Sequence, residues 1–308
     1  IGDCMLGLNG GSPLDNFGFD GDVRNPSYPE GWRTDIETYL TAYGAAGFNL
    51  FRWSVDNCAF GLYQTIDPSG NRYLQPEGIY GDQLAQSLRR HGIRNYMVIF
   101  GFFPPFPSGS NDPAQMDAIK RYVKYVADRY GAYVDFWELM NESPNPPITI
   151  DDGWYIQVAN YLREVDPYDH PISTSWQRPD LSVIDINSPH WYAKENEFGS
   201  DLATLDQIEF FKGHFNKPII FGEQGNSEQN WDARSALRMR IRSWTAFFNE
   251  AVLIFWNTSC CKDSQGGVAS NIYLGPEERG YVNILQDFVR DLDRRIVSTE
   301  IEISDPAR

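Results

Sequence analysis

Two stretches of the chain each leave a glutamate where an apolar, strand-like run ends. Residues 136–143 (FWELMNES) form an aromatic and aliphatic run that stops at Asn141 and Glu142 and is followed by a proline-rich segment. Residues 218–225 (PIIFGEQG) end in the same way at Glu223. Two carboxyl groups suit glycoside hydrolysis, because one can protonate the leaving oxygen while the other attacks the sugar. We therefore expect Glu142 and Glu223 to be a catalytic pair.

The length and the sequence pattern indicate one closed barrel. A chain of 308 residues with 42% hydrophobic content is ordinary for a single (β/α)8 domain. Short apolar runs alternate with segments of helical periodicity, which is the pattern of parallel βα units. We predict an α/β fold, a (β/α)8 TIM barrel, with residues 1–308 forming a single catalytic domain.

The predicted elements follow the alternation of strand-like and helix-like segments. The predicted strands are residues 4–9, 48–55, 95–102, 134–142, 171–176, 184–192, 218–223 and 251–257. The predicted helices are residues 32–45, 78–91, 113–130, 152–165, 202–215, 233–249 and 276–295. Only residues 177–183 separate the fifth and sixth strands, so we expect the helix between them to be degenerate.

Further polar and aromatic residues fall at the ends of predicted strands, where such a barrel carries its chemistry. Arg52 lies near the end of the second strand, His190 and Tyr192 lie at the end of the sixth, and Trp256 lies near the end of the eighth. Each has an ordinary structural explanation when taken alone. An interior arginine, for example, can pair with a buried carboxylate such as Glu138. Their joint occurrence at strand ends favours one polar site.

This arrangement resembles the clan A glycoside hydrolases, the retaining (β/α)8 enzymes that include the family 5 cellulases and mannanases. In that clan an Asn-Glu pair ends strand 4, and a nucleophilic Glu ends strand 7. Strand 2 supplies an Arg, strand 6 a His-x-Tyr motif and strand 8 a Trp. The resemblance implies that Glu142 is the acid/base, that Glu223 is the nucleophile, and that the substrate-binding residues are Arg52, Asn141, His190, Tyr192 and Trp256.

The resemblance also indicates which activities are to be expected. Family 5 enzymes usually have a His at the end of strand 3, whereas residues 100–105 (FGFFPP) are apolar here. Family 39 and other clan members share the two glutamates. The implied function is a retaining β-glycosidase, foremost an endo-β-1,4-glycanase acting on glucan or mannan. The alternatives are an exo-acting β-glycosidase and a sugar-binding barrel without catalysis.

The two glutamates have opposite requirements. A nucleophile must stay ionised, and both Arg52 and a hydrogen bond from Tyr192 would favour the charged form of Glu223. An acid/base must hold a proton, so we expect less polar surroundings for Glu142. The resemblance further implies that Asn141 binds the sugar 2-hydroxyl and that Trp256 lies under the reacting ring.

The amino-acid composition indicates which classes of molecule the protein binds. The chain has 42 acidic and 26 basic residues, a formal charge of −16, which disfavours nucleic acid and anionic membranes. Its 15% aromatic content suits stacking on sugars. No apolar run reaches the length of a membrane span, and no His, Asp or Glu cluster shows metal spacing. We expect a monomer that acts on a polysaccharide or oligosaccharide without a metal or other cofactor.

The cysteines bear on the cellular compartment. Cys4, Cys58, Cys260 and Cys261 do not show metal-ligand spacing. The last three follow the second and eighth predicted strands, so one rim of the barrel could carry a disulfide, although free thiols remain an alternative. We expect a secreted or extracytoplasmic protein whose signal peptide has been removed.

Overall fold

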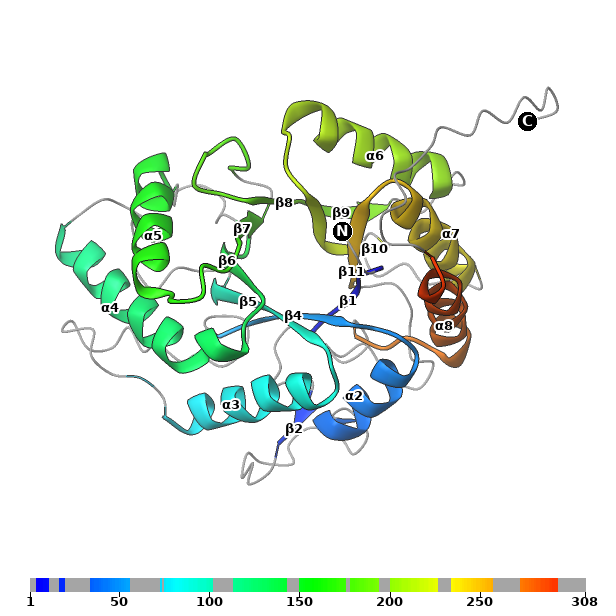
Figure 1. Ribbon diagram of the computed structural model, residues 1–308, viewed down its shortest axis with the longest axis horizontal. Coiled ribbons are helices and arrows are strands. Elements are labelled where there is room, and N and C mark those ends of the chain that lie inside the picture. The colour runs from blue at the N-terminus through cyan, green and yellow to red at the C-terminus, as the bar shows by residue number, and fades with distance from the viewer. Residues whose placement is uncertain are drawn as a thin grey trace.

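The closed parallel barrel predicted from the sequence is present in the computed structural model of the protein (Figure 1). The structure describes residues 4–10, 17–19, 34–55, 73, 75–101, 113–142, 150–175, 178–193, 200–226, 234–256 and 272–292. The barrel strands are β1 (Leu6–Asn9), β4 (Leu50–Ser54), β5 (Arg94–Phe100), β6 (Phe136–Met140), β7 (Ile172–Ser175), β8 (Ile186–Ser188), β9 (His190–Ala193), β10 (Ile219–Asn226) and β11 (Ala251–Phe255). They follow the order β11-β1-β4-β5-β6-β7-β8-β10-β9, and pairing of β11 with β10 closes the sheet. The short strands β2 (Phe17–Gly18) and β3 (Thr34–Asp35) pair separately.

Helices surround the barrel on its outer side (Figure 1). They are α2 (Ile36–Ala45), α3 (Gln75–Arg90), α4 (Pro113–Tyr130), α5 (Asp152–Val165), α6 (Ser200–His214), α7 (Ser235–Phe248) and α8 (Pro276–Arg290), with a short 3-10 turn, η1 (Gly131–Tyr133), after α4. The described residues between β7 and β8 contain only turns and bends, so the expected degenerate helix at this point is confirmed. The (β/α)8 fold is thus confirmed, with a shortened connection after β7.

The start of α2 differs from the prediction, which placed it at residue 32. The helix begins at Ile36 because the side chain of Asp35 caps it, accepting a hydrogen bond from the Thr38 backbone N–H at 2.8 Å. An aspartate that satisfies a free N–H of the first turn is a strong helix start. By contrast, α4 and α5 have the predicted boundaries.

Alternation along β4 decides which side chains face the barrel interior. The buried hydrophobic side chains form two clusters. Leu50 belongs to the smaller one, inside the barrel, whereas Phe51 and Trp53 belong to the larger one, between the barrel and the helices. Because successive strand residues point to opposite faces, Arg52 shares the interior face with Leu50. It is 3% exposed and lies near the carboxyl end of the barrel. The strand pattern therefore places a cation inside the barrel.

The sixth barrel strand is interrupted, where the sequence predicted one continuous segment. It is divided at Pro189 into β8 and β9, which both run beside β10. Ile219 of β10 pairs with Asn187, and Glu223 pairs with His190, so β10 carries one extra residue in this interval. Proline cannot donate a ladder hydrogen bond, which explains a break at this position. The resulting register sets His190 beside Glu223.

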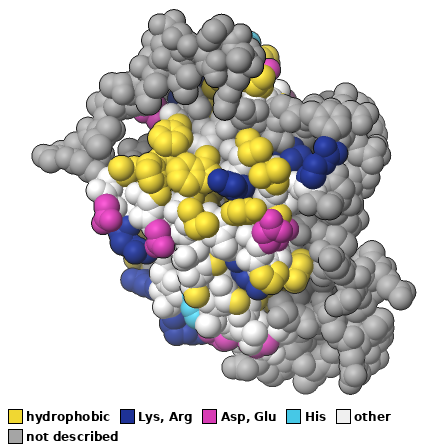
Figure 2. Space-filling view, turned by 90° about the vertical axis from the view of Figure 1, so that its right-hand side faces the viewer, with side chains coloured by type: hydrophobic (Ala, Val, Ile, Leu, Met, Phe, Trp, Pro, Cys, Tyr) yellow, Lys and Arg dark blue, Asp and Glu magenta, His cyan; other side chains and the backbone are white. Residues whose placement is uncertain are grey.

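Several large hydrophobic side chains are exposed on α6, α7 and α8. Figure 2 views the molecule from the side of these helices and shows hydrophobic side chains gathered there. Leu202 and Phe210 of α6, Phe248 of α7, and Ile284 of α8 are each more than half exposed. None of the described helices is both long and apolar enough to cross a membrane.

Only Cys4 of the four cysteines lies among the described residues. Its thiol is buried and unbridged, and burial raises its pKa to about 12. A thiol in this state is a poor nucleophile. Cys58, Cys260 and Cys261, the candidates for a disulfide on the rim, lie outside the described residues.

Asp166 connects the end of α5 to the barrel. Its carboxylate accepts hydrogen bonds from Trp137 Nε1 at 3.0 Å, from the Tyr168 backbone N–H at 3.1 Å, and from the His170 backbone N–H at 3.0 Å. Burial acts to raise the pKa of Asp166, but these donors outweigh it, so the pKa lies below its ordinary value. The ionised carboxylate therefore contributes to the stability of the fold.

Replacing Asp166 with Asn is expected to lower the free energy of unfolding by about 2 kcal/mol at neutral pH, because an amide cannot accept all of these bonds. A lowered pKa means that the contribution is present above the unfolded-state value of about 3.9 and is lost as the pH falls through the folded-state value. The difference between wild type and variant should thus be large at pH 7 and small at acidic pH in urea unfolding. Asp169→Asn, at a side chain that is 83% exposed, is the matched control. Equal stability of wild type and Asp166→Asn at pH 7 would contradict this account.

Candidate active site

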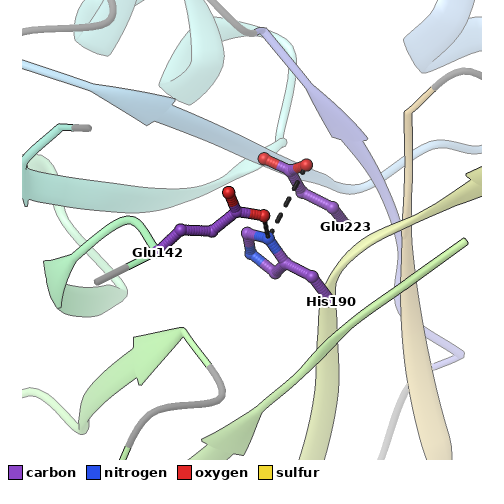
Figure 3. Close-up of side chains that lie close together, drawn as sticks. All are labelled: Glu142, His190 and Glu223. Carbon is purple, nitrogen blue, oxygen red and sulfur yellow. Dashed lines mark hydrogen bonds and ion pairs between the residues drawn. The ribbon is translucent and has the colours of Figure 1, made fainter. Parts of the chain in front are cut away.

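Polar side chains from six barrel strands or their ends meet at the carboxyl end of the barrel. The register sets Asn9 of β1 against Arg52 of β4, and His190 of β9 against Glu223 of β10. Figure 3 shows the side chains of Glu142, His190 and Glu223 converging from three segments of the chain. The site thus contains both predicted catalytic glutamates.

The carboxylate of Glu223 is surrounded by hydrogen-bond donors. Oε1 accepts from Arg52 Nη1 and from Asn9 Nδ2, each at 3.0 Å, and Oε2 accepts from the Tyr192 hydroxyl. The side chain is 13% exposed, so water screens these contacts little. A cation and directed donors stabilise a carboxylate in its charged form. The predicted contacts of Arg52 and Tyr192 with Glu223 are therefore present.

A buried ion pair holds Arg52 in place. Its Nε donates to Glu138 Oε2 and its Nη2 donates to Oε1 of the same carboxylate, both at 2.7 Å. Burial acts to lower the pKa of Arg52, but Glu138 and Glu223 outweigh it and raise that pKa. The predicted role of Glu138 as the partner of an interior cation is confirmed. The ion pair thereby holds the charged guanidinium in contact with Glu223, the candidate nucleophile.

The backbone turns sharply at the end of β6. Glu142 has φ of 30°, in the left-handed region that a non-glycine residue rarely adopts. Strain of this kind persists where the surroundings hold it. The preceding Asn141 is anchored, because its Oδ1 accepts from Arg52 Nη2 at 2.7 Å. This turn directs the Glu142 side chain toward Glu223 (Figure 3).

The surroundings of Glu142 are more polar than the sequence predicted. Its Oε1 lies 2.8 Å from His190 Nδ1, and the same nitrogen lies 3.7 Å from Glu223 Oε2. Burial acts to raise the pKa of Glu142, but the hydrogen bond with His190 and the electrostatic influence of His190 and Arg52 lower it overall. The expectation of weakly polar surroundings for Glu142 was therefore wrong. The physical reason is the histidine beside the carboxylate.

The His190 ring is fixed on its other edge as well. Its Nε2 lies 3.0 Å from Ser175 Oγ, and the His190 side chain is fully buried. Gly222 leaves room beside the ring, because a Cβ at that position would lie 2.7 Å from Ser188 Oγ and 3.1 Å from His190 Nε2. Asn9 and Ser175 were not predicted as site residues. Both fall at or near the ends of predicted strands, and this position is the signal in the sequence that could have indicated them.

Trp256 lies one residue beyond β11, at the same end of the barrel. Its backbone N–H donates to the Gln224 carbonyl oxygen at 3.0 Å, and its ring is partly buried against the main hydrophobic core. It is therefore near Glu223 along the β10–β11 interface. Its predicted role beneath a sugar ring stays a prediction.

The two glutamates face each other closely. One carboxylate oxygen of Glu142, one of Glu223 and one ring nitrogen of His190 all lie within 4.8 Å of one another. Three such atoms could in principle surround a metal ion. The Arg52 guanidinium 3.0 Å from Glu223 opposes a cation there, because it already neutralises that carboxylate. The arrangement suits two carboxyl groups that act on one bond.

Comparison with known proteins supports the fold. No protein-family model and no curated protein sequence matches the chain. A broad-specificity GH5-4 endoglucanase from Clostridium acetobutylicum is similar in structure, with TM-score 0.67, 15% identity, and coverage of 91% of this chain and 97% of that one. An endo-1,4-beta-mannanase from Rhizomucor miehei gives TM-score 0.67 and 14% identity over 94% and 95% of the two chains. An exo-beta-1,4-mannosidase from Opitutaceae bacterium strain TAV5 gives TM-score 0.62 and 13% identity over 92% and 60%.

Proposed function

We propose that the protein is a retaining β-glycoside hydrolase in which Glu142 is the acid/base and Glu223 is the nucleophile. The observation that carries this proposal is the pair of facing carboxylates, with oxygens within 4.8 Å of each other. Carboxyl groups about 5 to 5.5 Å apart favour direct attack on the sugar, whereas about 6.5 to 9.5 Å leaves room for a water and gives inversion. The close approach therefore supports retention.

The proposed reaction has two steps. In the first, Glu223 attacks the anomeric carbon, the bond to the leaving oxygen breaks, and that oxygen receives a proton from Glu142. In the second, Glu142 removes a proton from water, the water oxygen attacks the anomeric carbon, and Glu223 is released as a carboxylate. The hydrogen bonds from Arg52, Asn9 and Tyr192 suit Glu223 for both roles, because they hold one orientation of a good leaving carboxylate.

The proposed substrate is a β-1,4-linked polysaccharide, with glucan and mannan foremost. The names of the similar structures, an endoglucanase and an endo-mannanase, support endo-acting cleavage of such polymers. The exo-mannosidase with the same fold keeps an exo-acting enzyme as the second candidate. A barrel that only binds sugar is disfavoured, because both glutamates are present and face each other.

The test is hydrolysis of a panel of β-1,4-glucan, xyloglucan, β-1,4-mannan and xylan. We expect new reducing ends from at least one glucan or mannan, with viscosity falling before much sugar is released, as internal cleavage requires. A loss of viscosity that lags behind sugar release would indicate exo action. Binding to a polymer without new reducing ends would indicate a catalytically inactive barrel and contradict the proposal.

A further inference from the structure

A series of hydrogen bonds between largely buried side chains connects Glu142 to Glu223. It runs from Glu142 to His190, to Ser175, to Glu138 and on to Arg52, which contacts Glu223. Ser175 and Glu138 are both 0% exposed, so water does not compete for these bonds. A buried chain of hydrogen bonds of this kind constrains where each proton lies.

The position of the Ser175 hydroxyl proton follows from its neighbours. Glu138, ionised against Arg52, can only accept hydrogen bonds, and Ser175 Oγ donates to its Oε1. A hydroxyl has a single proton, so Ser175 has none to give to His190 and must accept from Nε2. The Arg52 Nη2 contact to the same oxygen, at 3.4 Å, is also a donor contact and changes nothing. The contact with Ser175 therefore favours a proton on Nε2 of neutral His190, which leaves Nδ1 able to accept the proton of Glu142.

We propose that Ser175 is a positioning residue: it fixes His190 as the Nε2–H tautomer, so that the Nδ1 lone pair faces Glu142 and the two groups share the catalytic proton. This inference rests on the proposed function of Glu142 as acid/base. The charged groups around the shared proton are Glu142 and Glu138 from the β6 segment, Glu223 from β10 and Arg52 from β4.

The polar surroundings lower the pKa of Glu142, although an acid/base must hold a proton. A proton shared with His190 meets this requirement. In the free enzyme the proton lies between Glu142 Oε1 and His190 Nδ1, which are 2.8 Å apart. When a glycosidic oxygen comes beside the carboxyl group, the O–H bond to Glu142 breaks and one to the leaving oxygen forms. In the second step the proton taken from water returns to the pair. The pair, rather than one carboxyl group, then titrates as the acid.

The tautomer can be read directly in the wild-type protein, independently of activity. The chain has 4 histidines, so ¹⁵N-labelled imidazole signals are few, and His190→Ala assigns the one of interest. At alkaline pH, long-range ¹H–¹⁵N correlation should show a protonated Nε2 and an unprotonated Nδ1 for His190. A neutral Nδ1–H tautomer would overturn the proposal. Because this spectrum needs no substrate, its result is separate from any failure of the hydrolysis test.

Ser175→Ala provides the kinetic test. The variant removes the acceptor for Nε2–H, which destabilises the form in which Glu142 and His190 share the proton. It also allows neutral His190 to donate Nδ1–H to ionised Glu142, which stabilises the form without that proton. Both effects make the pair lose its proton more easily. The alkaline limb of kcat/KM should therefore move to lower pH, by about 0.5 to 1 pH unit for one hydrogen bond.

Two further variants separate positioning from general damage. Ser173 lies on the same face of β7 and is equally buried, but its hydroxyl bonds Tyr96 and the Trp137 carbonyl oxygen. Ser173→Ala should leave the alkaline limb in place, and Ser175→Thr, which keeps the hydroxyl, should restore it toward the wild-type position. An unmoved limb in Ser175→Ala, or an equal shift in Ser173→Ala, would refute the role of Ser175.

Discussion

Replacing Glu223 with Ala is expected to reduce kcat/KM on every glycoside by about 10⁴-fold or more, because no group remains to attack the anomeric carbon. Glu223→Gln should lose a similar amount while keeping the shape of the site. Azide fits the space left in Glu223→Ala and attacks the sugar in a single displacement. A β-linked aryl glycoside should then give the α-glycosyl azide, identified by NMR.

Glu250→Gln is the matched control for this experiment, since Glu250 lies on an exposed turn just before β11 and its side chain is 54% exposed. It should retain wild-type kcat/KM. Substantial activity in Glu223→Ala without azide, or a β-glycosyl azide product, would remove Glu223 from the nucleophile role.

Replacing Glu142 with Gln or Ala is expected to lower kcat/KM on poor leaving groups by about 10² to 10⁴-fold, the usual loss for a general acid. Aryl glycosides with activated leaving groups need little protonation, so their first step should survive. Azide should then accelerate turnover of Glu142→Ala by attacking the glycosyl-enzyme, and two displacements give the β-glycosyl azide. The alkaline limb of kcat/KM should also disappear.

An equal loss of kcat/KM on poor and activated leaving groups, together with no effect of azide, would contradict the role of Glu142 as acid/base. The opposite anomers expected from the two variants make each one the control for the other. A single shared anomer would show that the two glutamates do not have different roles.

The features predicted correctly from the sequence depend on strong local signals. Barrel strands buried on both faces read as apolar runs, and the alternation along β4 places Arg52 inside, next to Glu138. The order of strand ends then brings Glu142 and Glu223 together. These inferences need only strand identity and the direction of parallel strands.

The environment of Glu142 depends on features that no local pattern reveals. The φ of 30° at Glu142, the strand break at Pro189 and the space left by Gly222 together bring the His190 ring against the carboxylate. Residues 142 and 190 are far apart in sequence, so their contact has no local signal. Asn9 and Ser175 were missed for a different reason, since small polar residues at strand ends are common and carry no distinguishing pattern.

The stereochemistry of the first product tests the central claim most directly, because it depends on the placement of Glu142 and Glu223 and needs no mutation. Proton NMR, recorded on a β-linked substrate before mutarotation, observes the anomer that the enzyme releases. The close approach of the two carboxylates predicts the β-anomer first, and a 2-fluoro glycoside of the accepted sugar should label Glu223. An initial α-anomer would contradict the account, as would a label on any other residue.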